Sequence, residues 1–348
     1  MRSLMIQKNQ TGRRLDKFLF KYLDKANSGF IYKMLRKKNI TLNGKKADGS
    51  EKLNLGDEIK IFFSDDTFEK FCSEKQNLNV SSSEQRNKIA LPKTGYFPKK
   101  QDIIYEDEHV LFLNKPAGML SQKAKNSDIS LNEYALSYLL SSEKISLQEL
   151  HTFKPSVCNR LDRNTTGLIT VGVSLHGARA LALGFQKRTF DKYYLCIVSG
   201  KLEKKADISG FLKKNSNTNQ VFVCQQPQED YSYIETSYEP LAVLEACTVL
   251  KVKLVTGKTH QIRAHLASIG HPVIGDMKYG KAAVNKAYRA KYGVKTQLLH
   301  SWQLCISQAQ NSETGLSYLC GKTFVAKPPK IYEELCGGLL WQHGIQED

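Results

Sequence analysis

A polar stretch near residues 64–100 divides this chain of 348 residues into a short and a long part, each with regular apolar patterns. Its centre at residues 77–88 reads NLNVSSSEQRNK, which has neither helical nor strand periodicity, and Pro92 and Pro98 follow. Because such a composition buries too little apolar surface to order the backbone, it predicts a flexible linker. The expected organisation is a small module at residues 1–66, a linker at 67–100, a larger domain at 101–335 and a C-terminal tail at 336–348.

The small module has the pattern of two helices followed by short strands. Apolar residues recur at i, i+3, i+4, i+7 and i+8 between Leu15 and Leu23, which places them on one helical face. A second helix is expected over residues 29–38, and a strand at 40–42 leads into a tight turn at Asn43 and Gly44. Basic side chains on these helices could bind phosphates without reading sequence, or could be a solvated face. The candidate RNA-binding residues are Arg13, Arg14, Lys33, Arg36, Lys37 and Lys38.

The charge of the whole chain narrows the classes of partner. Lysine and arginine total 51 and aspartate and glutamate total 34, which gives a formal net charge of +17. Such an excess attracts polyanions, so RNA, DNA and an anionic membrane surface come into question. No apolar run approaches the roughly 20 residues of a membrane-spanning helix, so we expect no membrane insertion. The eight cysteines form no Cys-x-x-Cys pair, which argues against zinc and dithiol redox sites and favours a cytoplasmic protein with reduced thiols.

The larger domain mixes many strand patterns with few helices. Residues 193–198 are apolar on both faces and predict a central strand, with further strands near 110–113, 168–171, 236–238 and 248–254. Ser174 is expected to cap one helix, and Thr259 to cap another that ends at Gly270. This mixture predicts an α+β domain with a mostly antiparallel sheet.

One carboxylate in the larger domain stands among arginines. Asp162 lies in residues 159–168, which read NRLDRNTTGL. An acid beside arginines is expected to be ionised at neutral pH, and an ionised carboxylate with a positioned partner can attack a sugar carbon. By itself the triplet Arg-Leu-Asp more often forms a surface ion pair.

Two further patterns could bind a polyanion or a base. Residues 257–266 read GKTHQIRAHL and place cationic side chains at a helix start, where anions are favoured. His260 and His265 are five residues apart, unlike the i, i+4 spacing of a zinc helix, so no metal site is expected. Tyr194 lies in the expected central strand, where a tyrosine is usually part of the core but can also stack on a base.

Four motifs taken in order resemble those of the RluA-type RNA pseudouridine synthases. They are YEDE at 105–108 with NKPAG at 114–118, NRLDRNTTGL at 159–168, KYYLCIVSG at 192–200, and TGKTHQIRAHL at 256–266 with GHPVIGD at 270–276. The N-terminal stretches RRLDKFL, LRK, ITLNG and LGDEI are similar to an alpha-L RNA-binding domain. This resemblance implies a mixed, mostly antiparallel central sheet of the pseudouridine synthase fold, preceded by a small helix-plus-strands RNA-binding domain.

The resemblance also implies roles for individual residues. It implies that Asp162, Tyr194 and Arg263 are catalytic. It further implies a group of substrate-binding residues, namely Arg160, Lys115, Lys258, His260 and Leu161. The implied isomerisation gains and loses no atoms, so we expect no cofactor. Asn159 stands where many members have histidine, and Ser121 and Gln122 replace a valine-histidine type of sequence, which leaves the choice of substrate open.

The expected partner is RNA, and large-subunit ribosomal RNA is the preferred target, with no protein partner implied and a monomer expected. Transfer RNA is an alternative, as is a non-catalytic RNA-binding protein of ribosome assembly. A zinc deaminase is disfavoured because no Cys-x-x-Cys pair is present. The basic stretch 278–295 is either an additional RNA-contacting arm or a solvated helix.

Overall fold

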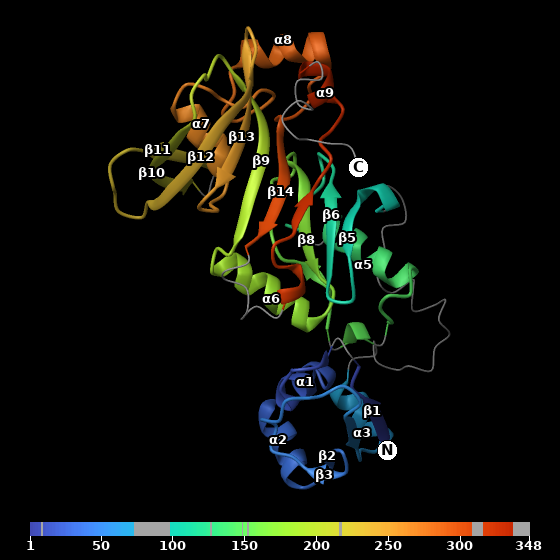
Figure 1. Ribbon diagram of the computed structural model, residues 1–348. Helices are drawn as coiled ribbons and strands as arrows, with labels where there is room; N and C mark the ends of the chain where they lie inside the picture. The colour runs from blue at the N-terminus through green and yellow to red at the C-terminus, as the bar shows by residue number, and fades with distance from the viewer. Residues whose placement is uncertain are drawn as a thin grey trace.

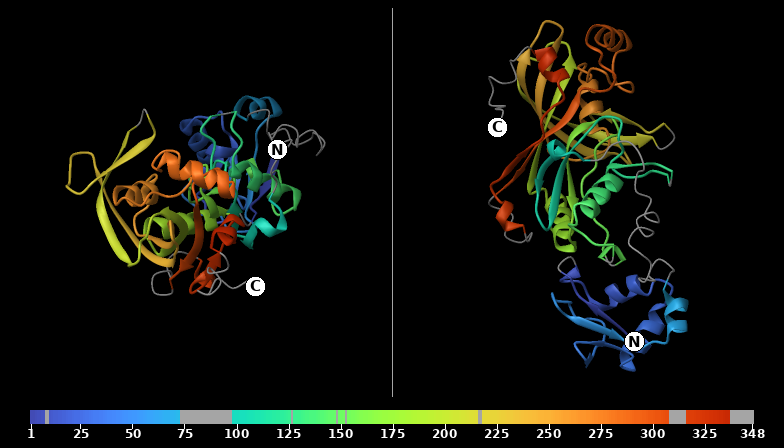
Figure 2. Two further views of the ribbon diagram at one scale, coloured as in Figure 1. Left: turned by 90° about the horizontal axis from the view of Figure 1, so that it is seen from above. Right: turned by 90° about the vertical axis from the view of Figure 1, so that its right-hand side faces the viewer.

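The computed structural model describes residues 1–7, 10–72, 98–125, 127–147, 149–151, 153–215, 218–307 and 316–336 (Figure 1). The apolar residues of the N-terminal module form a core of their own, and those of the large domain pack on both faces of a long sheet. The module lies at one end of the large domain, where Arg179 Nη1 donates to the carbonyl of Gly12 at 3.2 Å (Figures 1 and 2). None of the helices in the described ranges is long and apolar enough to span a membrane.

The N-terminal module contains the two helices and the short strands that the sequence predicted. Asn27 caps the second helix by accepting a bond from the Phe30 amide at 2.8 Å. Asn43 and Gly44 both have positive φ and make the tight turn between two strands. The strands pair in the order β1-β4-β2-β3. The elements are β1 (Arg2–Met5), α1 (Leu15–Tyr22), α2 (Ser28–Arg36), β2 (Ile40–Leu42), β3 (Lys45–Lys46), β4 (Glu58–Ile61) and α3 (Asp65–Phe71).

Helix α3 corrects the expected start of the linker. Its Phe68 and the following Cys72 are buried in the core of the N-terminal module, so the chain to residue 72 belongs to that module. The polar composition of this segment concealed the helix, which Ser64 caps and two buried side chains fix in place. Residues 73–97 of the expected linker and residues 337–348 of the expected tail lie outside the described residues. Lys100 already begins a short 3-10 helix, and Cys336, expected to begin the tail, is the buried last residue of α9.

The large domain is built on a mixed sheet of 11 strands, as the sequence predicted for its class. Its main path runs β11-β10-β12-β13-β9-β14-β8-β6-β5, with β15 on β14 and β7 on β8. Among these described strands, β14 and β8 pair in parallel and the other pairs are antiparallel. The strands are β5 (Ile103–Glu106), β6 (Val110–Lys115), β7 (Ser156–Val157), β8 (Thr166–Gly172), β9 (Phe190–Ser199), β10 (Ala206–Asn215), β11 (Gln220–Cys224), β12 (Ser232–Val243), β13 (Cys247–Leu254), β14 (Leu299–Ile306) and β15 (Thr323–Val325).

Strand β9 is central because both of its faces are covered. Leu195 and Ile197 pack in a core with side chains of helices α8 and α9, and Cys196 and Val198 pack on the opposite face with helix α7. This burial on two sides explains the continuous apolar run at 193–198. The helices are α5 (Leu131–Ser141), α6 (Leu175–Gln186), α7 (Gln261–Ser268), α8 (Ala282–Tyr292) and α9 (Ile331–Cys336), with short 3-10 helices at Lys100–Asp102, Glu149–His151 and Ser317–Leu319.

One of the two predicted helix caps is correct and the other is wrong. Ser174 caps α6 by accepting from the Gly177 amide at 3.0 Å. Thr259 does not cap α7, because His260 is the N-cap residue and has a left-handed backbone with φ of 54°. The side chain of Gln261, the first helical residue, accepts from the Lys258 amide at 3.0 Å and so closes the turn that precedes α7. This unusual start turns His260 toward the carboxylate of Asp162.

Candidate active site

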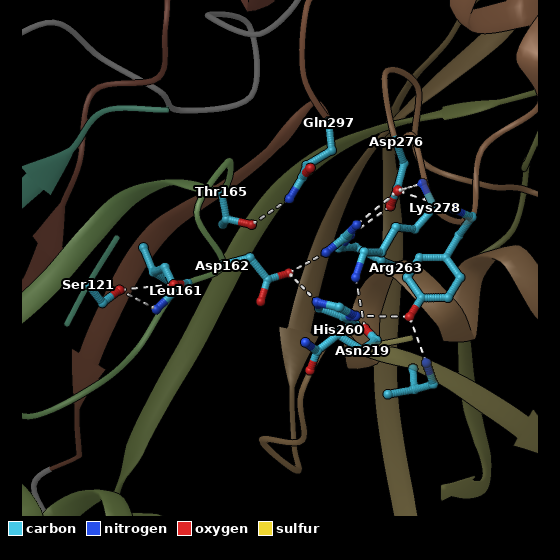
Figure 3. Close-up of polar contacts among 12 residues, drawn as sticks. Ser121, Leu161, Asp162, Thr165, Asn219, His260, Arg263, Asp276, Lys278 and Gln297 are labelled. Carbon is cyan, nitrogen blue, oxygen red and sulfur yellow. Dashed lines mark hydrogen bonds and ion pairs between the residues drawn. The ribbon is translucent and has the colours of Figure 1, made fainter. Parts of the chain in front are cut away.

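The loop that carries Asp162 connects β7 to β8 and is tied to the rest of the domain by neutral hydrogen bonds. Ser121 Oγ accepts from the Leu161 amide at 3.0 Å and donates to the Leu161 carbonyl at 2.9 Å (Figure 3). Beyond Asp162, the Thr165 amide donates to the Asp162 carbonyl at 3.1 Å and Gln297 donates to Thr165 Oγ1 at 3.2 Å. The backbone on both sides of the carboxylate is therefore fixed.

Asn159 anchors the start of the same loop. Its Oδ1 accepts from the amide of Thr170 at 2.7 Å and from the Thr170 hydroxyl at 3.1 Å, which binds the loop to β8. Gly167 fixes the other end, since its φ of 106° and its close approach to the backbone of Ser301 leave no room for a Cβ. The loop thus sits at the point where β8 and β14 pair in parallel.

Lys115 lies beneath this loop at the end of β6. Its Nζ donates to the carbonyls of Pro116, Met119 and Arg163 at 2.9, 2.9 and 3.0 Å. The residue is 0% exposed, so all three ammonium donors are used and none faces a substrate. Burial lowers the pKa of Lys115 to about 7, although the negative charge of Asp162 acts in the opposite direction. The expectation that Lys115 binds substrate directly is therefore not supported, because its contacts hold the backbone.

Arg263 on α7 joins the Asp162 carboxylate to a second carboxylate. Its Nη1 donates to Asp162 Oδ2 at 2.6 Å, and its Nε and Nη2 donate to Asp276 Oδ2 and Oδ1 at 2.6 and 2.9 Å (Figure 3). Burial by itself lowers the pKa of Arg263, but hydrogen bonds and charge from Asp276, and then from Asp162, raise it overall. Burial likewise favours protonated Asp276, yet the guanidinium holds the pKa of Asp276 below its ordinary value. The guanidinium is thus a fixed cation that orients Asp162.

The Asp162 side chain is 26% exposed, and its two oxygens differ. Oδ2 accepts the hydrogen bond from Arg263, while no described residue donates to Oδ1. A paired oxygen keeps the carboxylate in one orientation, and the other oxygen remains available to a reacting group. Among the described residues, no group of three histidine, cysteine or acidic side chains is placed to hold a metal ion.

His260 and Tyr279 form a short polar chain beside the carboxylate. His260 Nε2 lies 3.8 Å from Asp162 Oδ2, and its Nδ1 lies 2.9 Å from the Tyr279 hydroxyl. That hydroxyl also accepts from the Val221 amide at 2.8 Å. Burial lowers the pKa of His260, with the charge of Asp162 opposing this effect, so the ring is neutral at pH 7. A tyrosine hydroxyl that donates to Nδ1 leaves the imidazole proton on Nε2, the nitrogen that faces Asp162.

Tyr194 on β9 shares a buried cluster with Leu161, the residue before Asp162. Its side chain is 7% exposed. Burial raises the pKa of Tyr194 to about 12, a hydrogen bond from Ser301 opposes the shift, and the charge of Asp162 adds to it. Tyr194 is therefore a neutral phenol at physiological pH. The fold thus brings Asp162, Tyr194 and Arg263 together from a loop, a strand and a helix.

The other predicted site residues occupy different environments. Arg160 and Lys258 are exposed and lie two residues before Asp162 and five residues before Arg263 in the chain. Leu161 is buried in the core and serves packing. The four cations of the second N-terminal helix and its end are exposed, whereas Arg14 pairs with Asp16 at 2.9 Å and Arg13 donates to the Lys17 carbonyl.

Two residues of the site were not singled out by the sequence reasoning. Asp276 is the last residue of the stretch GHPVIGD and is 0% exposed. Its position directly after a mostly apolar run could have indicated a buried carboxylate with an ion-pair partner. Tyr279, three residues further on, gave no signal, because its contact with His260 arises from the left-handed start of α7.

The sequence and the fold are both similar to those of known proteins. The sequence profile described as RNA pseudouridylate synthase matches residues 109–268, which include Asp162, Tyr194 and Arg263. The chain is 28% identical over 313 residues to a ribosomal large subunit pseudouridine synthase C of Vibrio parahaemolyticus, covering 88% of this chain and 89% of that protein. It is 27% identical over 312 residues to a ribosomal large subunit pseudouridine synthase D of Nitrosomonas europaea, covering 89% and 81%. The solved structure of human RNA pseudouridylate synthase domain containing 4 shares the fold, with a TM-score of 0.52, 18% identity and coverage of 69% of this chain and 93% of that one.

Proposed function

We propose that this chain is an RNA pseudouridine synthase, an isomerase, and that it modifies specific uridines of large-subunit ribosomal RNA with Asp162 as its catalytic carboxylate. The proposal rests on the surroundings of the Asp162 carboxylate. One oxygen is held by Arg263 at 2.6 Å, the other meets no donor among the described residues, and the buried phenol of Tyr194 lies nearby.

The isomerisation requires a group that acts on a sugar carbon. The bond from a uracil nitrogen to the ribose anomeric carbon breaks, the base turns, and a ring carbon forms the new bond. That carbon loses its proton and the freed nitrogen gains one, so no atoms are gained or lost overall. Carboxylates serve the same purpose at other glycosidic centres, either as nucleophiles or as stabilisers of positive charge on the sugar. The free Oδ1 of Asp162 is the atom that we assign to this role.

The neighbouring side chains support the steps before and after bond cleavage. A uridine in a stack or duplex must first be flipped out, and the exposed Arg160 and Lys258 are suited to hold the rearranged backbone. Tyr194 would stack on the base and, as a neutral phenol with its pKa raised to about 12 by burial, would exchange a proton with base or sugar. Arg263 would keep Asp162 ionised and oriented, and neutral His260 would donate toward the carboxylate.

Large-subunit ribosomal RNA is the substrate that we favour over transfer RNA. Two relatives matched over more than four fifths of this chain are named for the ribosomal large subunit, and the basic N-terminal module is suited to structured RNA. Such a substrate implies action in the cytoplasm, and we expect a monomer. A non-catalytic role in ribosome assembly is disfavoured, because Asp162, Tyr194 and Arg263 gather at one place without being needed for RNA binding alone.

Mapping pseudouridines in cellular RNA with and without the gene tests the proposal. We expect one or a few positions in large-subunit ribosomal RNA to lose the modification when the gene is deleted and to regain it on complementation. Loss confined to transfer RNA would replace the proposed substrate. An unchanged map in both RNA classes would overturn the proposed function.

A further inference from the structure

Helix α8 and its flanks form a cationic surface that the catalytic residues do not explain. From residue 277 to residue 312 the sequence contains no aspartate or glutamate. Six basic residues in this region are all exposed, and none belongs to an ion pair among the described residues: Lys278, Lys281, Lys286, Arg289, Lys291 and Lys295. A helix face that is merely solvated usually mixes both signs of charge, so this one-sided composition is suited to a polyanion.

The apolar side of α8 is already occupied by the protein itself. Val284, Tyr288 and Tyr292 pack against the core beneath the sheet, beside helix α9. The residues between the cations on the outer face are small, with Ala282, Ala283, Ala287 and Ala290 exposed. A helix that lies in a membrane surface needs a bulky apolar face, and α8 has none to offer.

Helix α8 is also fixed to the catalytic site. Asn285 Oδ1 accepts from the Gly275 amide at 2.8 Å, and its Nδ2 donates to the Asp276 carbonyl at 2.9 Å. The Asp276 side chain in turn holds Arg263. The cationic helix and the ion pair that orients Asp162 are therefore parts of one packed unit.

Its position separates this surface from the basic N-terminal module. Helix α8 lies at the end of the large domain opposite the module, as the orange helix at the top of Figure 1 and of the right-hand view in Figure 2 shows. An RNA that contacts both must therefore extend along the domain that carries Asp162.

We propose that the outer face of α8 binds the phosphate backbone of the RNA substrate beside the target uridine. The inference rests on the proposed function and adds a second RNA-contacting surface to it. Phosphate contacts of this kind fix the register of a nucleic acid without reading its bases, so they should govern affinity and its salt dependence, not the chemical step.

The test compares two variants with the same change in charge. K286Q with R289Q removes two cations from α8. R188Q with K322Q removes two exposed cations elsewhere on the large domain. Lys322 lies beside the end of β14, where the Ile306 amide donates to its carbonyl. The probe is an RNA fragment containing the mapped uridine. We expect the α8 variant to bind it several-fold more weakly, with the slope of log K against log salt reduced by roughly 1.4 to 1.8. Its kcat should equal that of the control variant while its KM rises.

Equal affinity and equal salt slope in the two variants would overturn the inference and leave α8 a solvated face. Stronger loss of binding to anionic phosphatidylserine vesicles than to RNA would also overturn it, in favour of a lipid surface. Pseudouridine formation by the unaltered protein is measured in the same reactions. If the unaltered protein forms no pseudouridine, the proposed function fails. If it forms pseudouridine but the two double variants bind RNA equally well, only the proposed role of α8 fails.

Discussion

Asp162 and Arg263 meet at 2.6 Å, yet the two regions that present them are held by different interactions. The loop of Asp162 is fixed by hydrogen bonds between side chains and backbone, from Ser121, Lys115 and Asn159. Arg263 is fixed by charge, through a bidentate contact with the fully buried Asp276. One region positions a backbone, and the other positions a side chain.

This difference predicts how much stability a substitution in each region costs. A hydrogen bond to the backbone contributes modestly, so losing one should shift the loop without unfolding the domain. A buried ion pair behaves otherwise, because removal of one partner leaves an uncompensated charge in a low-dielectric environment. Substitutions on the Arg263 side should therefore cost more stability than those on the Asp162 side.

The largest effect is expected from D276N. It leaves the Arg263 guanidinium buried with half of its charge compensation, which should lower the free energy of unfolding by about 3–5 kcal/mol and sharply reduce kcat. D191N is the matched control, since Asp191 pairs with Lys253 at 3.0 Å on the surface and should cost about 0–1 kcal/mol. Urea unfolding of both variants measures the difference in their free energies of unfolding. Equal decreases would show that the buried ion pair stabilises the fold no more than the surface pair does.

A smaller effect is expected from S121A. It leaves the amide and carbonyl of Leu161 without their partner, which should cost about 1–3 kcal/mol. Turnover should fall less than in D276N, with RNA affinity retained. S137A is the control, because the Ser137 hydroxyl donates to the Glu133 carbonyl within α5 and makes no hydrogen bond to the Asp162 loop among the described residues. A kcat for S121A as high as that of S137A would contradict a positioning role for Ser121.

The smallest expected effect is a dependence of stability on pH. The pKa of Lys115 is lowered by burial to about 7 in the folded protein, against 10.5 ordinarily. Between these values the unfolded chain holds a proton that the folded chain has released, so stability should rise with pH by at most about 1.4 kcal/mol per unit. K115M should lack this rise, which amounts to about 1 kcal/mol between pH 7 and pH 8, and the exposed-site control K201M should keep it, as urea unfolding at about pH 7 and about pH 8 would measure. Parallel behaviour of K115M and K201M would contradict the lowered pKa of the buried Lys115.

The elements of the fold were readable from the sequence because their signals are local. The helical spacing from Leu15 to Leu23 gave α1, and the run at 193–198 gave a central strand because both of its faces are buried. Helix α3 was missed, since a polar segment with two buried side chains resembles a linker in composition.

The site was predictable only in part, because its contacts join distant positions. Arg263 and Asp162 were associated by resemblance to a family, not by any spacing, and they are 101 residues apart. The contact of Ser121 with Leu161 spans 40 residues and leaves no mark in the sequence. Lys115 was expected at the substrate through the same resemblance, whereas its ammonium is buried among two carbonyls of its own turn and the carbonyl of Arg163. Burial of a lysine is rare and has no signal in the sequence.

The most direct test of the account replaces the carboxylate itself. D162N keeps the shape of the side chain and an oxygen that can accept from Arg263, but removes the negative charge and the second carboxylate oxygen. Pseudouridine formation under single-turnover conditions and affinity for the same RNA are measured on the purified protein. We expect no detectable product, with RNA affinity retained. Normal turnover of D162N on its true substrate would contradict it.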